Sequence, residues 1–382
     1  MSTPLLQVRD LKVHFQPPRR GFGKTPPPIR AVDGVSFEVE AGRTLGLVGE
    51  SGCGKSTTAR AILNLISHAD RGGEVLLDGV RVDQLSESDM RLHRSKAQMV
   101  FQDPFASLNP RMTVGKIIRE PIRNFDLGLT QWDEQLEVIR LMELVGINPR
   151  YMNRYPHEFS GGQRQRIGIA RALAVQPKLI VCDEAVSALD VSIQAQVINL
   201  LMDLQQKLGV AYVFISHDLA VVRHIADRVG VMYLGRIVEL ADSDKLYKTP
   251  RHPYTKALLS AAPVPDPEQN VSQNRVKLEG EVPLPDIEYA GCPFADRCPE
   301  VLGHCRSTPP TLSSEAHQVS CLLYEQASSG DLGHGLHRDG RGNRFQYDEC
   351  PGSHHRRHRS GTSKRPTRLG RLGQSIQPTS GW

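Results

Sequence analysis

The sequence predicts an α/β fold built on a mostly parallel β-sheet. Short apolar runs typical of buried strands, at residues 44–48, 179–182 and 210–215, alternate with longer segments of helical periodicity. A glycine-rich turn of the kind that binds phosphate directly follows the first of these runs. The chain has 382 residues, enough for one large core and additional smaller parts.

The N-terminal part is expected to consist mainly of strands. Strands are predicted at Leu5–Phe15, Ala31–Val39 and Thr44–Val48. A Pro- and Gly-rich loop is predicted at residues 17–28, between the first two strands. Residues 74–82 alternate in polarity about Asp78-Gly79, a pair typical of a tight hairpin turn. A helix is expected to begin near Gly54.

Helices are expected to predominate after residue 103. Residues 103–153 have a mixed, mostly helical pattern, and a helix is predicted at 161–175. A long amphipathic helix is predicted at Asp190–Leu208, with Gly209 as its stop. Further buried strands are predicted at 179–182, 210–215 and 231–240.

The formal net charge of +5 comes from the end of the chain. Residues 326–382 hold ten Lys and Arg and four Asp and Glu, whereas the preceding 325 residues hold 37 basic and 38 acidic groups. This Gly- and His-rich tail is expected to be disordered. A nearly neutral body and a tail with few aromatic residues give no reason to expect nucleic-acid binding. No apolar stretch is long enough to span a bilayer, and Arg9, Asp10 and Lys12 argue against a secretory signal.

Residues 49–56 fit the phosphate-binding pattern G-x-x-x-x-G-K-[ST], between a predicted strand and a predicted helix. The glycines allow backbone N–H groups to turn inward on a phosphate, and the helix N-terminus adds partial positive charge. Lys55 is expected to bridge the β- and γ-phosphates of ATP, and Ser56 to bind Mg²⁺. The expected ATP-binding set is Gly49, Glu50, Ser51, Gly52, Cys53, Gly54, Lys55, Ser56 and Thr57.

Polar residues also follow three other apolar runs. Asp183 and Glu184 come directly after residues 179–182, so Asp183 is expected to hold Mg²⁺ and Glu184 to polarise the attacking water. His217 is expected to orient that water, although a His at a strand end is often structural. Gln102 is expected to contact Mg²⁺ or water, with a plain turn residue as the alternative. The predicted catalytic residues are therefore Glu184, His217, Gln102 and Lys55.

The segment S-G-G-Q at residues 160–163 predicts a Ser-capped helix N-terminus and hence a second anion site. A chain with a phosphate loop and a separate anion-binding helix end can pair head to tail and clamp each ATP between two subunits. The loop, Gln102, Asp183-Glu184, residues 187–190 and His217 follow one another in the order typical of the nucleotide-binding subunits of ABC transporters, which the chain resembles over about residues 5–260. The residues expected to contact the ATP of the partner subunit are Ser160, Gly161, Gly162 and Gln163.

Further segments are similar to the oligopeptide/dipeptide importer branch of that family. These segments are 101–104, 107–112, 154–159, 191–196 and 252–255. The resemblance implies an ATPase on the cytoplasmic face of the inner membrane, bound to two permease subunits and fed by an extracytoplasmic solute-binding protein. A sister ATPase is expected to complete a heterodimer. The alternatives are an importer ATPase for another small solute, such as nickel, and a soluble ABC-type ATPase that does not act in transport.

The resemblance also implies an order of domains. An ABC nucleotide-binding domain is expected at 1–260, with an antiparallel β part and a helical subdomain at about 103–175. A Cys-rich module at 261–325 and the tail at 326–382 are expected to follow. Within the nucleotide-binding domain, Asp190 is implied to couple the two ATP sites across the dimer.

The sequence departs from the family pattern in two respects near the ATP site. Residue 185 is Ala where the family usually has Pro, which removes a backbone restraint behind Glu184 but no chemical group. An aromatic residue that stacks on adenine normally precedes the strand before the phosphate loop. Phe15 and Phe22 are both candidates.

Four cysteines cluster near the end of the body with the spacing C-x5-C-x6-C-x15-C. A cytoplasmic compartment disfavours disulfides, and two of the cysteines precede Pro, as in ferredoxin-type runs. The spacing lacks the C-x2-C pair of most zinc sites. An iron–sulfur cluster is therefore the leading hypothesis, zinc the second and unligated thiols the alternative. The residues concerned are Cys292, Cys298, Cys305 and Cys321.

Overall fold

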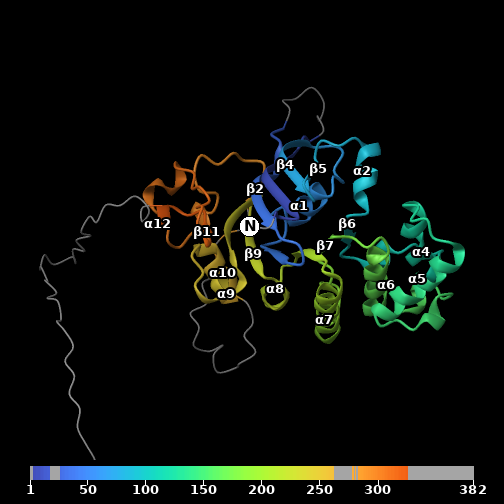
Figure 1. The fold of residues 1–382 in the computed structure, drawn as a ribbon. Coiled ribbons are helices and arrows are strands. Elements are labelled where there is room, and N and C mark those ends of the chain that lie inside the picture. The colour runs from blue at the N-terminus through green and yellow to red at the C-terminus, as the bar shows by residue number, and fades with distance from the viewer. Residues whose placement is uncertain (1–2, 18–25, 262–277, 279, 281–282, 326–382) are drawn as a thin grey trace, which may run out of the picture. The chain divides into compact units, whose positions relative to one another are not determined.

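The computed structural model describes residues 3–17, 26–261, 278, 280 and 283–325. All of them belong to one unit, Met1–Gly330, in which helices surround two β-sheets (Figure 1). The tail at 326–382 and most of the predicted loop at 17–28 lie outside the described residues. Within the described part of the chain, no helix has the length and apolar character needed to cross a membrane.

The larger sheet has seven strands in the order β11-β10-β9-β3-β8-β7-β6. Five neighbouring strands, from β9 to β6, run parallel, and β10 and β11 extend that sheet in antiparallel fashion. The mostly parallel core sheet predicted from the sequence is therefore confirmed. Its strands are β3 (Thr44–Val48), β6 (Ala97–Val100), β7 (Leu179–Asp183), β8 (Ala211–Ile215), β9 (Arg228–Tyr233), β10 (Arg236–Asp242) and β11 (Gln318–Val319).

Both faces of this sheet are buried. On β8, Tyr212 and Phe214 pack into a core shared with the helices, whereas Val213 and Ile215 pack into a second core shared with the other sheet. Successive residues of a strand point to opposite faces, so a strand covered on both sides must be apolar throughout. This burial explains why the core strands appear in the sequence as continuous apolar runs.

The smaller sheet is antiparallel, with the strand order β2-β1-β4-β5. The hairpin between β4 and β5 turns at Asp78 and Gly79, whose φ angles are 53° and 77°. Two consecutive positive φ values are the requirement of a tight type I′ turn, so the predicted hairpin is confirmed. The strands are β1 (Leu6–Phe15), β2 (Ile29–Val39), β4 (Asp70–Leu77) and β5 (Val80–Arg81).

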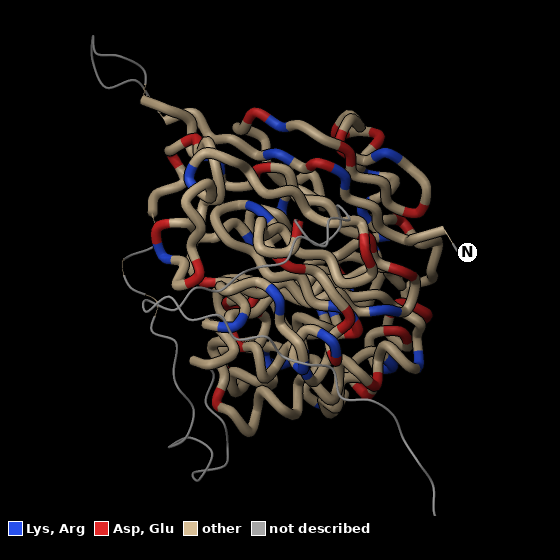
Figure 2. Tube along the Cα trace, turned by 90° about the vertical axis from the view of Figure 1, so that its left-hand side faces the viewer, with Lys and Arg blue, Asp and Glu red and all other residues tan. Residues whose placement is uncertain are grey.

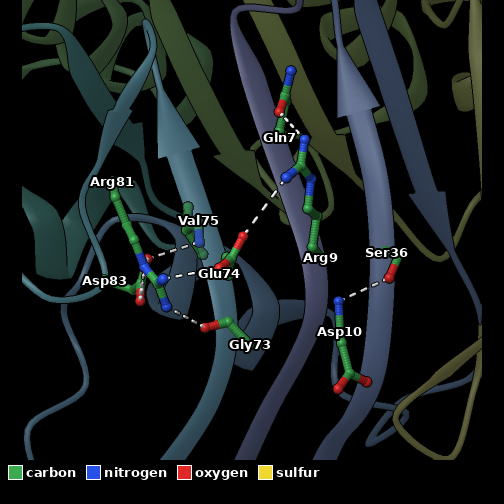
Figure 3. A network of polar contacts seen from close by, with 9 residues as sticks. All are labelled: Gln7, Arg9, Asp10, Ser36, Gly73, Glu74, Val75, Arg81 and Asp83. Carbon is green, nitrogen blue, oxygen red and sulfur yellow. Dashed lines mark hydrogen bonds and ion pairs between the residues drawn. The ribbon is translucent and has the colours of Figure 1, made fainter.

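The smaller sheet has an irregularity in the middle of β1 (Figure 3). Asp10 takes a φ of 47°, and its N–H donates to the Ser36 hydroxyl at 2.8 Å. On β4, Gly73 takes a φ of 89° and lies so close to β1 that a Cβ atom would stand 2.4 Å from the carbonyl oxygen of Asp10. Arg81 donates to the Gly73 carbonyl oxygen and to Glu74, which holds this edge of the sheet in place.

The helices fall into groups around the seven-stranded sheet. Helices α4, α5 and α6 pack together beside β6 and form the helical part expected at about 103–175 (Figure 1). Helix α7 ends before Gly209, whose φ of 68° stops it as predicted. The helices are α1 (Lys55–Ile62), α2 (Glu87–Arg94), α3 (Pro104–Ser107), α4 (Val114–Asn124), α5 (Gln131–Leu144), α6 (Gly161–Leu173), α7 (Val191–Leu208), α8 (Leu219–Ile225), α9 (Ser243–Lys248), α10 (Pro253–Ala261) and α12 (Leu322–Glu325), with 3-10 turns at Pro149–Tyr151, Pro156–Glu158, Ala295–Arg297 and Gly303–Arg306.

The single strand predicted at 231–240 was wrong. The structure has two antiparallel strands there, β9 and β10, joined by a turn at Leu234 and Gly235 with φ angles of 44° and 76°. Both strands are buried, so the apolar run continues through the turn. One glycine in such a run is a weak turn signal, because glycine also occurs within strands.

Charged residues of both signs are interspersed along the described chain (Figure 2). One example joins the two sheets: the ammonium groups of Lys96 and Lys178 both donate to Asp78, at 2.9 Å. These hydrogen bonds, with that from Lys178 the larger, hold the pKa of the Asp78 carboxyl below its ordinary value. The distribution agrees with the nearly neutral charge counted for residues 1–325.

The close approach at Gly73 generates a prediction about stability. Gly73→Ala should lower the free energy of unfolding by about 3 kcal/mol or more, because a positive φ and a backbone clash both oppose the added Cβ. Gly79→Ala is the matched control, since Gly79 also has a positive φ but has nothing within 4 Å of the added atom. It should cost about 1–2 kcal/mol. Urea unfolding followed by circular dichroism measures both, and equal losses would contradict the packing argument.

Candidate active site

The phosphate loop joins β3 to α1, and its conformation depends on glycine. Gly49, Gly52 and Gly54 all have positive φ angles, of 151°, 81° and 102°. A Cβ atom at Gly49 would stand 2.2 Å from the Met232 carbonyl oxygen, and one at Gly54 would stand 2.1 Å from that of Ala31. Two of these glycines are therefore required by packing against β9 and β2 as well as by their own backbone angles.

Lys55 lies inside this loop and is only 4% exposed. Its Nζ donates to the carbonyl oxygens of Gly49, at 2.8 Å, and of Glu50, at 3.0 Å. Cys53 Sγ lies 3.7 Å from the same Nζ, and burial raises the pKa of the Cys53 thiol, which favours its neutral form. The loop thus presents one buried cation and a helix N-terminus, a donor set that fits the phosphates of ATP.

Asp183 lies at the carboxyl end of β7 and is 4% exposed. It accepts a hydrogen bond from Ser56 Oγ at 2.7 Å. Burial raises the pKa of the Asp183 carboxyl, and the Ser56 hydrogen bond opposes that effect. A hydroxyl and a carboxylate beside the phosphate loop are ligands that fit Mg²⁺.

Glu184, which follows β7, is approached by the side chains that follow β6 and β8. Its Oε2 accepts a hydrogen bond from Gln102 Nε2 at 2.9 Å, and His217 Nδ1 lies 3.6 Å from the same oxygen. Glu184 itself has a positive φ of 48°, and its N–H donates to the Ile215 carbonyl oxygen at 3.0 Å. The structure therefore brings together the three residues expected to handle the attacking water.

The turn behind Glu184 is closed without a proline. Ser187 Oγ donates to the Glu184 carbonyl oxygen at 2.9 Å, and Ala185 is buried, with 2% exposure. This hydrogen bond and the packing of Ala185 restrain the backbone where the family pattern usually relies on proline.

Residues 160–163 begin α6, away from the loop in the chain. Ser160 Oγ accepts the Gln163 N–H at 3.3 Å, and Gln163 Oε1 accepts the Ser160 N–H at 3.1 Å, which completes a capping box. A Cβ atom at Gly162 would stand 2.4 Å from Ile193 Cγ2, so the small residue lets α6 approach α7. Asp190 precedes α7 without a side-chain capping bond. Among the described residues, no hydrogen bond or ion pair links residues 160–163 to the phosphate loop.

Comparison with known proteins assigns the family. Residues 32–187 match the ABC transporter family, and residues 238–305 match the oligopeptide/dipeptide transporter C-terminal region. The chain is 54% identical over 321 residues to the oligopeptide transport ATP-binding protein OppF of Salmonella typhimurium, across 83% of this chain and 96% of that protein. The chain belongs to the ABC transporter family. It is an ABC ATPase, and the resemblance seen in the sequence is confirmed.

Other relatives of this ABC ATPase support the same family assignment. It is 51% identical over 324 residues to the oligopeptide transport ATP-binding protein AppF of Bacillus subtilis, across 84% of this chain and 97% of that protein. A dimeric ATP-binding cassette solved in a post-hydrolysis state with ADP and Pi superimposes with a TM-score of 0.55 at 25% identity, across 62% of this chain and 98% of the other. ATP binding and dependence on Mg²⁺ are typical of this family.

The cysteines of the ABC ATPase give no support to an iron–sulfur or zinc site. Cys292, Cys298, Cys305 and Cys321 are all free thiols, and no group of three or more His, Cys, Asp or Glu in the described part of the chain is placed to hold a metal ion. Burial raises the pKa of Cys292 and Cys321 to about 11. Cys305 packs with Ala295 and Leu322. The spacing, the Cys-Pro pairs and the expected compartment led to the cluster hypothesis, but in the structure Cys305 is a small buried packing group.

Phe15 and Phe22 were the two candidates for the residue that stacks on adenine. Phe15 ends β1 and is half-buried against the core between the sheets, whereas Phe22 lies outside the described residues. The assignment of the adenine-stacking residue therefore stays a prediction.

Sequence reasoning missed two contacts to the phosphate loop, from Tyr254 and Arg297, because no local motif links residues more than 200 positions apart.

The position of Glu184 generates a prediction about catalysis. Glu184→Gln should still bind ATP but hydrolyse it about 100-fold more slowly or worse, since the amide cannot take a proton from water. Phosphate release by the assembled transporter and binding of a fluorescent ATP analogue to the purified chain measure the two effects. Glu137→Gln, which disturbs only an ion pair with Arg140 on α5, is the control. Near-normal turnover of Glu184→Gln would refute the role assigned to Glu184.

Proposed function

We propose that this ABC ATPase is the subunit that powers import of di- and oligopeptides through a membrane permease. One observation carries the proposal: the chain is 54% identical, across 83% of its own length and 96% of the relative's, to a protein named as an oligopeptide transport ATP-binding protein. The match of residues 238–305 to an oligopeptide/dipeptide transporter region supports the same substrate class independently of the ATP site.

The contacts of the active site support a division of roles among its residues. Lys55 and the loop N–H groups hold the phosphates of ATP, and Glu184 takes the proton of the attacking water. Gln102 and His217, which both face Glu184 Oε2, orient that water. Mg²⁺, when bound by Ser56, Gln102 and Asp183, neutralises charge on the phosphates.

A second ATPase subunit completes each ATP site in this proposal. Residues 160–163 begin α6, and Ser160 and Gln163 are exposed there although Gly162 is buried, so an anion can approach the helix end. They reach the ATP held by the partner, and Asp190, also exposed, transmits its state across the interface. A related but distinct sister chain forms the heterodimer. ATP binding closes this pair, and hydrolysis by Glu184 with His217 lets it open.

A cleft beside Gln102 offers a surface for the permease. The cleft has a volume of about 330 Å³, and its lining includes apolar residues of α2, β6 and α4, among them Met90, Met99 and Pro121. Phe101 lines the cleft directly before Gln102, so a permease segment bound there can move Gln102 relative to Glu184. Two permease subunits and an extracytoplasmic solute-binding protein complete the importer, with this chain on the cytoplasmic face of the inner membrane.

The division of the chain belongs to the same proposal. Residues 1–260 form the nucleotide-binding domain, with the helical subdomain at about 103–175. Residues 261–325 form the C-terminal module, and residues 326–382 form the tail.

Peptide uptake tests the proposed substrate class. Cells that lack the gene should lose uptake of a labelled tripeptide, and uptake should return with the wild-type chain but not with Glu184→Gln. Uptake of the corresponding free amino acid is the control, because it does not pass through this permease. Unchanged peptide uptake together with lost nickel uptake would show that the transporter imports nickel and not peptides.

The cleft generates a second prediction for the same assay. Leu65 lines it and is 44% exposed. Leu65→Glu should reduce peptide uptake about tenfold, because a charge in an apolar contact disfavours docking, while ATP binding by the purified chain is retained. Leu208→Glu is the matched control, since Leu208 is 46% exposed at the end of α7 and does not line the cleft. Equal peptide uptake in the two variants would show that the cleft does not contact the permease.

A further inference from the structure

The side chain of Glu50, in the phosphate loop, is held by an arginine from the C-terminal part of the chain. Arg297 Nη1 donates to Glu50 Oε2 at 2.8 Å, and Arg297 Nη2 donates to Glu50 Oε1 at 3.1 Å. The Arg297 side chain is only 8% exposed and that of Glu50 is 27% exposed. A two-point, largely buried arginine–carboxylate pair fixes both charge and orientation.

The backbone of Glu50 is held from the same direction. Its N–H donates to the Tyr254 hydroxyl at 3.0 Å, and Tyr254 is fully buried. The Tyr254 ring packs edge-on against Tyr233 with centroids 4.8 Å apart. Arg297 Nη1 lies 3.5 Å from the Tyr233 hydroxyl, so the two contacts to Glu50 share one aromatic support.

The C-terminal part of the chain is itself fastened to the sheet. Glu239 on β10 is fully buried and accepts the backbone N–H groups of Arg251, at 2.8 Å, and of His252, at 2.9 Å. His317 Nε2 lies 2.7 Å from Glu239, next to the pairing of β11 with β10. Because these contacts anchor the chain on both sides of Arg297, its guanidinium has a defined place beside the loop.

The negative charge of Glu50 makes its contact with Arg297 relevant to the binding of ATP. Glu50 is the single acidic residue in the loop sequence 49–57, whose purpose is to hold a polyanion. An unpaired carboxylate there would repel the phosphates and compete for Lys55, and a partly buried position screens such repulsion poorly. Arg297 cancels this charge without entering the phosphate-binding loop itself.

We propose that Arg297 is a positioning residue for the phosphate loop: it neutralises and orients Glu50, and thereby makes ATP affinity depend on the docked C-terminal part of the chain. The proposal requires only that the chain binds ATP, as its family does, and it holds whichever solute is transported.

Binding of a fluorescent ATP analogue, methylanthraniloyl-ATP, to the purified full-length chain tests the proposal. Arg297→Ala should weaken binding about tenfold, and Arg297→Lys should recover part of the loss because it restores the charge but not the two-point contact. Arg306→Ala is the matched control: Arg306 lies in the same region, is 60% exposed and, among the residues that the structure describes, forms its ion pair with exposed Asp296. It should bind the analogue as the wild type does.

The double variant separates a charge effect from a general structural one. In a Glu50→Gln background, Arg297→Ala should change the affinity less than twofold, because the charge that it balanced is gone. In the assembled transporter, Arg297→Ala should raise the KM for ATP more than it lowers kcat. If Arg297→Ala fails to fold, Arg297→Gln, which keeps a polar side chain but not the charge, takes its place. Wild-type affinity in either variant, or an equal loss with and without Glu50, would overturn the proposal.

Discussion

The register of four parallel strands determines the chemistry of the site. In β6, β7 and β8, Val100 pairs with Cys182 and Asp183 pairs with Ile215, so these strands end at nearly the same level. The phosphate loop leaves β3 at that same edge, since Leu47 also pairs with Ile215. The residues that follow each strand therefore meet in one small volume, as is general for the carboxyl ends of parallel sheets. Gln102, Glu184 and His217 come into contact as a consequence of this register.

The phosphate loop is shaped by contacts from several parts of the chain. Backbone oxygens of β2 and β9 lie where side chains at Gly54 and Gly49 would have to be, and Tyr254 and Arg297 hold Glu50. The loop is thus packed on its outer side before any ligand arrives. Such preorganisation lowers the ordering cost of binding, and it also makes the loop responsive to the C-terminal part of the chain.

Local signals predicted the elements that they specify directly. The Asp78-Gly79 turn and the stop at Gly209 both require positive φ angles, which few other residues adopt, and both are present. The turn at Leu234-Gly235 was missed because apolar residues continue through it on both sides. The four-cysteine spacing led to a metal hypothesis that the structure does not support, since spacing along a chain contains no information on the direction of each thiol.

The sequence by itself determined the parallel α/β core, the phosphate loop, the two acids at the end of β7 and the family, because each is encoded within a few consecutive residues. Only the tertiary structure decided which side chains meet: Gln102 with Glu184, 82 positions apart, and Arg297 with Glu50, 247 positions apart. Such pairs depend on the packing of all the elements between them, and two-point charge pairing leaves no periodicity or motif in the sequence. The local chemistry of ATP binding can therefore be predicted from the chain, whereas its link to the C-terminal part follows from the folded structure.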